Sequence, residues 1–403
     1  MDAVATESNS QSPRARAWRG TLSGFSACLV GIGLARFGYT PLLPAIIGAH
    51  WFGSSGAAYL GAANLAGYLV GALLARPAVA HVPARVMLRM MMCLATAAFF
   101  ACAQPVSFLW FFVWRFLSGV SGGLLMVLAA PTVLPHVQPS RRGLAGGLIF
   151  MGVGIGIAGS GTLVPLLLRE GLGETWVGLG LLSVLLTIAA WRGWPADDLP
   201  HATPQAHRRS HKIGALRALY VEYALNAVGL VPHMMFLVDF IARGLGKGVQ
   251  TGAEYWVLFG LGATVGPILS GSLADCAGFR RSLRLAYLIE ACAVLLPALG
   301  LGPVSLMASA VIVGAFTPGI VPLVLGRVHE LLAHHPAEQK AAWSKATVSF
   351  AVLQAAAAYG LSFVFAHSDG DYVQLFIIGA AALMLALVID LVAGIRGQRV
   401  QPN

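Results

Sequence analysis

The sequence predicts an all-helical integral membrane protein in which twelve transmembrane helices form two pseudo-symmetric bundles of six. The first observation is composition: 57% of the 403 residues are hydrophobic and only 10% are charged, whereas about a quarter of a soluble domain is charged. The second is a series of twelve apolar runs, each close to the ~20 residues that cross a bilayer. The third is one hydrophilic interruption, which divides the series into six and six.

The apolar runs define the domain organisation. The first set lies at residues 21–47, 56–75, 84–103, 107–134, 143–168 and 173–191. The second set lies at residues 214–241, 252–270, 282–299, 304–326, 342–366 and 371–393. We therefore expect an N-terminal bundle at 18–192 and a C-terminal bundle at 214–394. The remaining segments are polar, and we expect a disordered tail at 1–17, a linker at 193–213 and a second tail at 395–403.

The distribution of Lys and Arg predicts the orientation in the membrane. With the N-terminus inside, 21 of the 26 basic residues lie in inner segments, three in outer segments and two within helices. An excess of basic residues marks the cytosolic side of membrane proteins. We expect both termini and the linker in the cytosol, and the protein in a bacterial inner (cytoplasmic) membrane. The same rule accounts for the net charge of +10, so nucleic-acid binding is not expected.

A patterned stretch lies between the eighth and ninth apolar runs. Its defining residues are Gly271, Asp275, Gly278, Arg280 and Arg281. We expect a short glycine-bounded turn that presents an acid and then a basic pair. A weaker copy begins 200 residues earlier at Gly71, with Ala75 in the place of the acid. The chain therefore reads as two related halves, of which the second keeps the motif.

This stretch resembles the signature of the major facilitator superfamily, which stands between helices two and three and again between helices eight and nine. Cys276 departs from the signature, where the family usually has Arg or Lys. The resemblance implies that superfamily's fold, transport by alternating access, and a gating role for the motif. The segments 31–44 and 59–68 resemble the YbfB/YjiJ-type branch of the superfamily.

Polar residues in the first half indicate a cavity. A charge at bilayer depth is costly unless it faces a cavity or a partner, and Arg36 lies in the middle of the first apolar run. The candidate cavity residues of this half are Arg36, Tyr39, Thr40 and Asn64. A structural bridge to an acid or to carbonyls is the alternative for Arg36. Arg115 resembles the Arg-x3-Gly motif of the fourth helix, which implies proton coupling; its alternative is a bond to neighbouring carbonyls.

The seventh helix carries a polar stripe. Residues spaced by 4, 3, 4 and 7 share one helix face, and here they are Glu222, Asn226, Gly229, His233 and Phe240. We expect Asn226 and His233 to face the same aqueous cavity as Arg36, and Glu222 to take part in coupling. A packed histidine that bonds a carbonyl is the alternative for His233. Gln354, in the eleventh helix, is the last cavity candidate.

These features predict a secondary active transporter of a small organic solute, preferably an anion with Arg36 as its counter-charge. The sequence has no phosphate-binding loop, so the expected energy source is an ion gradient, and we expect protons to be the coupling ion. One alternative is a multidrug-like proton antiporter that exports apolar cations with Glu222 as the charge partner. Another is a non-transporting membrane sensor on the same fold.

No enzyme chemistry is predicted. The segment His329–His335 resembles a metalloprotease motif, but Ala333 stands where the second histidine would have to be. We therefore expect no metal and no cofactor. The expected partners are the solute, protons and the lipid bilayer, and the protein is expected to be monomeric.

Overall fold

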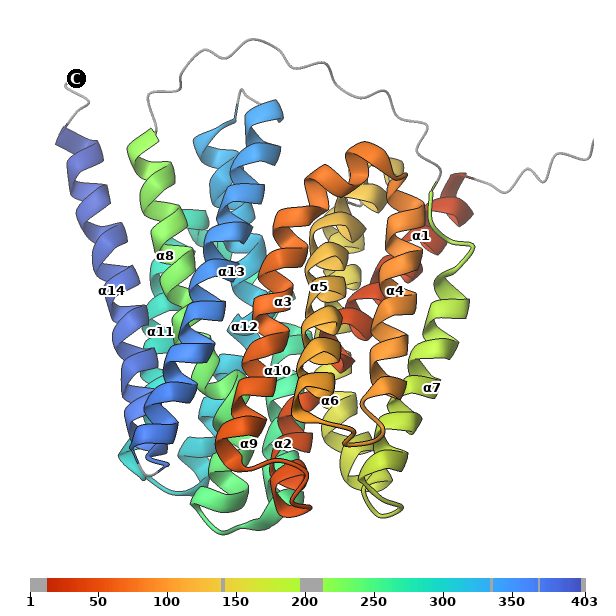
Figure 1. Cartoon of the computed structure of the whole chain (residues 1–403). Coiled ribbons are helices and arrows are strands. Elements are labelled where there is room, and N and C mark those ends of the chain that lie inside the picture. Colours follow the sequence, from red (N-terminus) through yellow and green to blue (C-terminus); the bar gives the residue numbers. More distant parts are fainter. Residues whose placement is uncertain (1–12, 139–141, 196–212, 334–335, 369, 400–403) are drawn as a thin grey trace, which may run out of the picture.

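The computed structural model describes residues 13–138, 142–195, 213–333, 336–368 and 370–399. Across these ranges twelve helices are long and apolar enough to cross a membrane, and there is no strand. The predicted all-helical fold with twelve spanning helices is therefore confirmed. Figure 1 shows that α1 begins and α14 ends at the same end of the bundle, which we call the terminal end.

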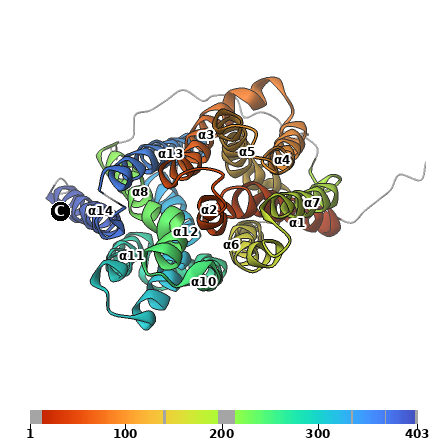
Figure 2. The same ribbon diagram turned by 60° about the horizontal axis from the view of Figure 1, so that its bottom comes forward.

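The two halves each supply six spans. The N-terminal half consists of α1 (Pro13–Cys28), the π-helical turn η1 (Leu29–Leu34), α2 (Tyr39–Gly48), α3 (Ser54–His81), α4 (Ala84–Ala101), α5 (Phe108–Val133), the 3-10 turn η2 (Leu134–His136), α6 (Arg142–Leu167) and α7 (Leu172–Ala190). The C-terminal half consists of α8 (Ile213–Val231), the π-helical turn η4 (Pro232–Phe236), α9 (Leu237–Asp239), the π-helical turn η5 (Phe240–Gly244), α10 (Gly248–Ala277), α11 (Phe279–Leu299), α12 (Pro303–Leu331), α13 (Pro336–His367) and α14 (Tyr372–Arg399). Figure 2 shows the halves side by side, with α3 next to α13 and α6 next to α10.

Helix extends into both predicted tails. α1 begins at Pro13 and α14 runs to Arg399, so part of the segments 1–17 and 395–403 is helical. The rest of these tails, and most of the predicted linker, lie outside the described residues.

The first and seventh spans are interrupted at corresponding places, although the sequence predicts each as one continuous helix. In the first span the amide of Ala35 donates to the carbonyl of Val30 at 3.0 Å, one residue farther back than in an α-helix. In the seventh span the turns η4 and η5 flank the short α9. Pro232 at the start of η4 has no amide hydrogen, which favours a break there. Such π-helical turns are frequent at functional sites.

The patterned stretch 271–281 is helical and not a turn, which corrects the sequence prediction. α10 continues to Ala277 and α11 begins at Phe279, so Gly278 alone separates them. Gly278 has φ +80° and ψ 153°, a conformation that side chains disfavour. Helix α10 extends past its predicted end because Ala274 is still buried on its packed face.

The halves contact each other through small residues in the part of the bundle remote from the terminal end. On α10, a Cβ added at Gly260 would lie 2.2 Å from the backbone nitrogen of Ala158 on α6. Tyr59 of α3 stacks on Tyr359 of α13, with ring centres 6.2 Å apart. By contrast, a Cβ at Gly271, near the terminal end of α10, would meet no neighbouring atom within 4 Å. The halves are therefore closed on each other at one end.

Candidate functional site

A small cavity lies at the centre, where the two interrupted spans meet. Its polar lining comes from the first half: Arg36, Tyr39, Thr40, Asn64 and Arg115. Two methionines close it from the second half: Met234 and Met235. The volume of about 20 Å³ has room for a water molecule but not for an organic solute. The structure thus brings together four predicted cavity residues and one predicted coupling residue.

Arg36 carries a charge that no acid neutralises in the described part of the chain. Its Nη2 atom lies 3.8 Å from the sulfur of Met234, and its Nε atom is buried without a hydrogen-bond partner. The guanidinium carbon lies 5.0 Å from the ring centre of Tyr68 and 5.1 Å from that of Phe37. Aromatic faces and a thioether compensate a buried cation only in part. The guanidinium of Arg36 therefore keeps unused hydrogen-bonding capacity beside the cavity.

Met234 is the main contact between the halves at this site, and the sequence did not indicate it. Thr40 donates to its backbone carbonyl at 2.5 Å, and the amide nitrogen of Gln354 lies 3.7 Å from its sulfur. Gln354 thus lies beside the cavity lining, where the sequence predicted a cavity residue. The available signal was Pro232 two residues earlier, because a proline inside a helix marks an irregular turn.

Arg115 and Asn64 hold the interruption of the first span in place. The Nη1 atom of Arg115 donates to the carbonyl of Ala35 at 2.7 Å, and its guanidinium lies 4.3 Å from the ring centre of Tyr39. Asn64 donates to the backbone carbonyl of Arg115 at 3.1 Å. The carbonyl bond is the alternative that the sequence left open for Arg115. It ties α5 to the site where the first span loses its α-helical hydrogen bonds.

The polar stripe of the seventh span faces the interior of the C-terminal bundle, so the expectation that it shares a cavity with Arg36 is corrected. Asn226 donates to Glu290 of α11 at 2.7 Å. The Nε2 atom of His233 lies 2.7 Å from the hydroxyl of Ser309 on α12. The reason is physical: partner helices satisfy polar groups at bilayer depth as well as a wet cavity does. Helical spacing shows which residues share one face of the span, but it does not show which helix or cavity that face contacts.

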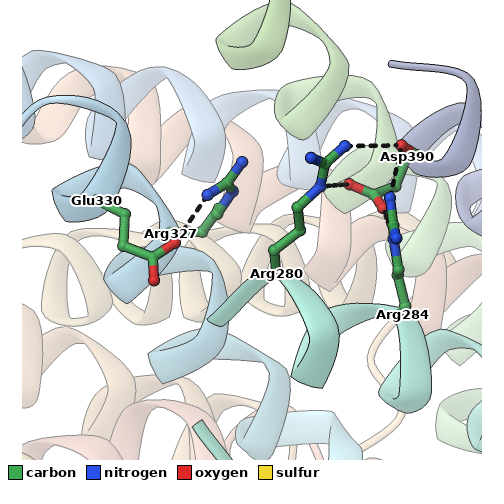
Figure 3. A network of polar contacts seen from close by, with 5 residues as sticks. All are labelled: Arg280, Arg284, Arg327, Glu330 and Asp390. Carbon is green, nitrogen blue, oxygen red and sulfur yellow. Dashed lines mark hydrogen bonds and ion pairs between the residues drawn. The ribbon is translucent and has the colours of Figure 1, made fainter. Parts of the chain in front are cut away.

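Glu222, Arg280 and Arg284 lie near the terminal end of the C-terminal half. Arg280 and Arg284 both pair with Asp390 of α14, the former at 3.5 Å (Figure 3). Glu222 is buried within electrostatic range of both arginines and of Arg327. The sequence did not indicate Asp390, because it lies in an apolar run far along the chain.

The patterned stretch 271–281 is only partly described. Arg280 contacts its own half and Arg281 is exposed, while the side chain of Asp275 lies outside the described part of the chain. Gly278 is the hinge between two helices. The structure therefore shows the motif joining α10, α11 and α14 within one half.

Two halves of six spans, with interrupted first helices that meet at a central cavity, define a multi-pass membrane transporter of the major facilitator type. The family model described as "Uncharacterised MFS-type transporter YbfB" matches residues 28–391, and the chain belongs to this family.

The solved structures support the same fold. The chain is similar to the crystal structure of a mutant of the nucleoside transporter NupG, with a TM-score of 0.70 and 14% identity. The match covers 95% of this chain and 100% of that chain. At this identity the similarity establishes the fold alone. A search of curated proteins found no match.

Proposed function

We propose that this transporter carries a small organic anion across the inner membrane by alternating access, with Arg36 as the counter-charge of the substrate. The observation that supports this most directly is a cation at bilayer depth with no acid beside it among the described residues, on the wall of a cavity between the halves. An anion would supply the missing partner, and charge-assisted hydrogen bonds are the strongest that a guanidinium forms.

The contacts of Met234 suggest how binding is linked to the conformational change. The sulfur of Met234 is a weak acceptor for Arg36, so a carboxylate of the substrate would displace it. Thr40 of the first half also bonds to Met234, and separation of the halves would break both of these contacts, whereas the contact of Gln354 with Met234 lies within the second half. A substrate in the cavity would thus exchange weak contacts between the halves for its own.

The proposed energy source is the proton gradient, with Glu222 and Arg115 as the candidates taken from the sequence. In the proposed orientation the terminal end faces the cytosol, in agreement with the excess of basic residues there. The proposed working unit is a monomer whose partners are the solute, protons and the bilayer.

Export of apolar cations with Glu222 as the charge partner has weaker support. Glu222 is not among the cavity-lining residues, and it lies in range of three arginines, which would repel a cation. A sensor without transport activity has no specific observation in its favour.

Uptake by proteoliposomes tests the proposal, with benzoate as an aromatic carboxylate probe and benzamide as its uncharged counterpart. Arg36→Gln should abolish benzoate uptake while leaving membrane levels and melting temperature near those of the wild type. Loss of a charged hydrogen bond, about 1.5–3 kcal/mol, corresponds to a roughly tenfold or greater loss of affinity. Arg76→Gln, which alters an exposed arginine of the same half, is the matched control and should transport normally.

The result has three informative outcomes. Benzamide uptake by Arg36→Gln together with lost benzoate uptake would show that the site recognises the charge. An Arg36→Gln protein that fails to accumulate would instead indicate a structural bridge. The anionic substrate class would be refuted if the wild type took up no member of a panel of aromatic and aliphatic carboxylates.

A further inference from the structure

Four acidic side chains are buried in the described part of the chain: Glu222, Asp239, Glu290 and Asp390. Asp239 pairs with Arg243 at 2.5 Å, and Asp390 pairs with two arginines. Glu222 and Glu290 form no salt bridge. An ionised carboxylate without a cation is strongly disfavoured in a membrane interior. These two residues are therefore candidates for carrying a proton.

Glu290 is the deeper of the two along its helix. It has 0% exposure and lies 11 residues beyond the start of α11 at Phe279, which corresponds to about 16 Å of helix. Glu222 lies nine residues beyond the start of α8 and is close to the arginine cluster of Figure 3. Glu222 therefore has nearby positive charge that Glu290 lacks.

The contact between Asn226 and Glu290 has the form of a proton site. The amide nitrogen donates to the Oε2 atom of Glu290 at 2.7 Å. The remaining oxygens, Oδ1 of Asn226 and Oε1 of Glu290, are both buried without a partner. Both are acceptors when the carboxyl is ionised, whereas a protonated carboxyl is also a donor. A single proton on Glu290 would therefore turn one of these two unpaired acceptors into a donor.

We propose that Glu290 is the proton-binding residue of this transporter and that Asn226 positions its carboxyl group. This inference rests on the proposed proton-coupled function and names the residue that binds the proton. The step is a protonation of the carboxylate oxygen in one conformation and release of the same proton in another. No other co-reactant is needed.

The groups around Glu290 indicate how a proton reaches it. Tyr287, one turn nearer the terminal end, has a buried hydroxyl without a partner and lies in electrostatic range of Glu222, Glu290 and Asp390. The helix α8 brings Asn226 and Glu222 toward α11, and α14 brings Asp390. Tyr287 and Glu222 are thus the groups past which a proton from the terminal end would reach Glu290.

Two further titratable groups lie on the same span as Asn226: Tyr223, which is also in range of Tyr287, and His233. His233 bonds to Ser309 of α12, whose hydroxyl donates to the carbonyl of Ala293 on α11 at 2.6 Å. Since that hydroxyl hydrogen is used, the Nε2 atom of His233 is the donor in its bond to Ser309. None of the described side chains places a cation against Glu290.

The position of Asn226 connects the proton site to the cavity. Asn226 and Met234 lie on the same span, eight residues apart, and Met234 bonds to Thr40 and contacts Arg36. A change in the bond between α8 and α11 would therefore act on the span that closes the cavity. Proton binding and substrate binding would therefore both act on the seventh span.

Infrared difference spectroscopy tests the site without a substrate, using the full protein in lipid nanodiscs during a pH titration. The wild type should show a titrating carbonyl band of a protonated carboxyl, and Glu290→Gln should lose it. Glu222→Gln is the matched change at the other unpaired acid. This variant should keep the carbonyl band of Glu290, but the band should appear more slowly after a pH jump. Asn226→Leu should shift the band frequency, because the carboxyl loses its hydrogen-bond partner.

A band that persists in Glu290→Gln, that disappears only in Glu222→Gln, or that never titrates in the folded wild type would overturn the assignment. Size-exclusion profiles verify folding. Should Glu290→Gln not fold, the band shift in Asn226→Leu decides the question, since an unchanged frequency contradicts the proposal.

Transport provides the second readout. In proteoliposomes with benzoate, and after subtraction of the diffusion of benzoic acid measured in protein-free liposomes, Glu290→Gln should lose accumulation driven by a pH gradient but retain exchange of labelled for unlabelled benzoate. Retained gradient-driven accumulation would overturn the proposal. Absence of benzoate transport in the wild type would count against the proposed substrate class alone, because the infrared band is measured without substrate.

Discussion

Two arginines at the centre of the molecule have different surroundings, and at the scale of single residues this separates their roles. Arg115 is buried, donates to the carbonyl of Ala35 and lies over the ring of Tyr39. Arg36 has a weak sulfur contact and an unpaired Nε atom at the cavity. The guanidinium of Arg115 is hydrogen-bonded within the protein, whereas that of Arg36 keeps hydrogen-bonding capacity for a ligand.

Arg115→Gln should therefore lower stability, in contrast to Arg36→Gln. The change removes the donor to Ala35, and an unpaired buried polar group costs about 1–3 kcal/mol. Thermal melting of the purified variants in detergent measures the difference. If Arg115→Gln melts like the wild type but does not transport, a direct coupling role would replace the positioning role.

At the scale of elements, the junction between α10 and α11 depends on one glycine. Gly278 has a positive φ angle, whereas Gly271 lies within α10 and has open space around it. The sequence assigns both glycines to one turn, but the structure gives them different backbone requirements. The salt bridges of Asp390 with Arg280 and Arg284 then join α11 to α14 beyond this junction.

Gly278→Ala should destabilise the protein by about 1–3 kcal/mol, because alanine must adopt a sparsely populated backbone conformation. Gly271→Ala is the matched control and should be neutral or stabilising by up to about 1 kcal/mol, since alanine is the better helix former. Melting temperatures of the two variants provide the comparison. Equal losses would favour the turn predicted from the sequence.

At the scale of the whole molecule, the two halves contact each other away from the terminal end through glycines of α6 and α10. A cavity of about 20 Å³ between them is too small for an organic solute, so transport requires the halves to move apart. Their orientation in the membrane decides which side the terminal end faces.

The proposed orientation is tested by single-cysteine labelling of intact cells with an impermeant reagent, in a variant whose native cysteines are replaced. Lys247→Cys, in the connection before α10, should be labelled from outside, whereas Ser210→Cys, in the predicted linker, should be labelled only after permeabilisation. External labelling at position 210 would reverse the topology.

The sequence by itself determined the membrane environment, the twelve spans and the division into related halves, because hydrophobicity and helix length are properties of each segment alone. It also identified Arg36, Tyr39, Thr40, Asn64 and Arg115, which the structure brings around one cavity. It did not predict the interruption of the first and seventh spans, which appears only in the structure.

Only the tertiary structure decided which partner each buried polar group has. Asn226 bonds to Glu290 and His233 to Ser309, while Met234 and Asp390 supply contacts that no motif marks. The reason is that helical periodicity specifies which residues share a face, whereas the packing of distant helices determines what that face meets. The proton and substrate sites proposed here therefore follow from contacts between helices and not from spacing within them.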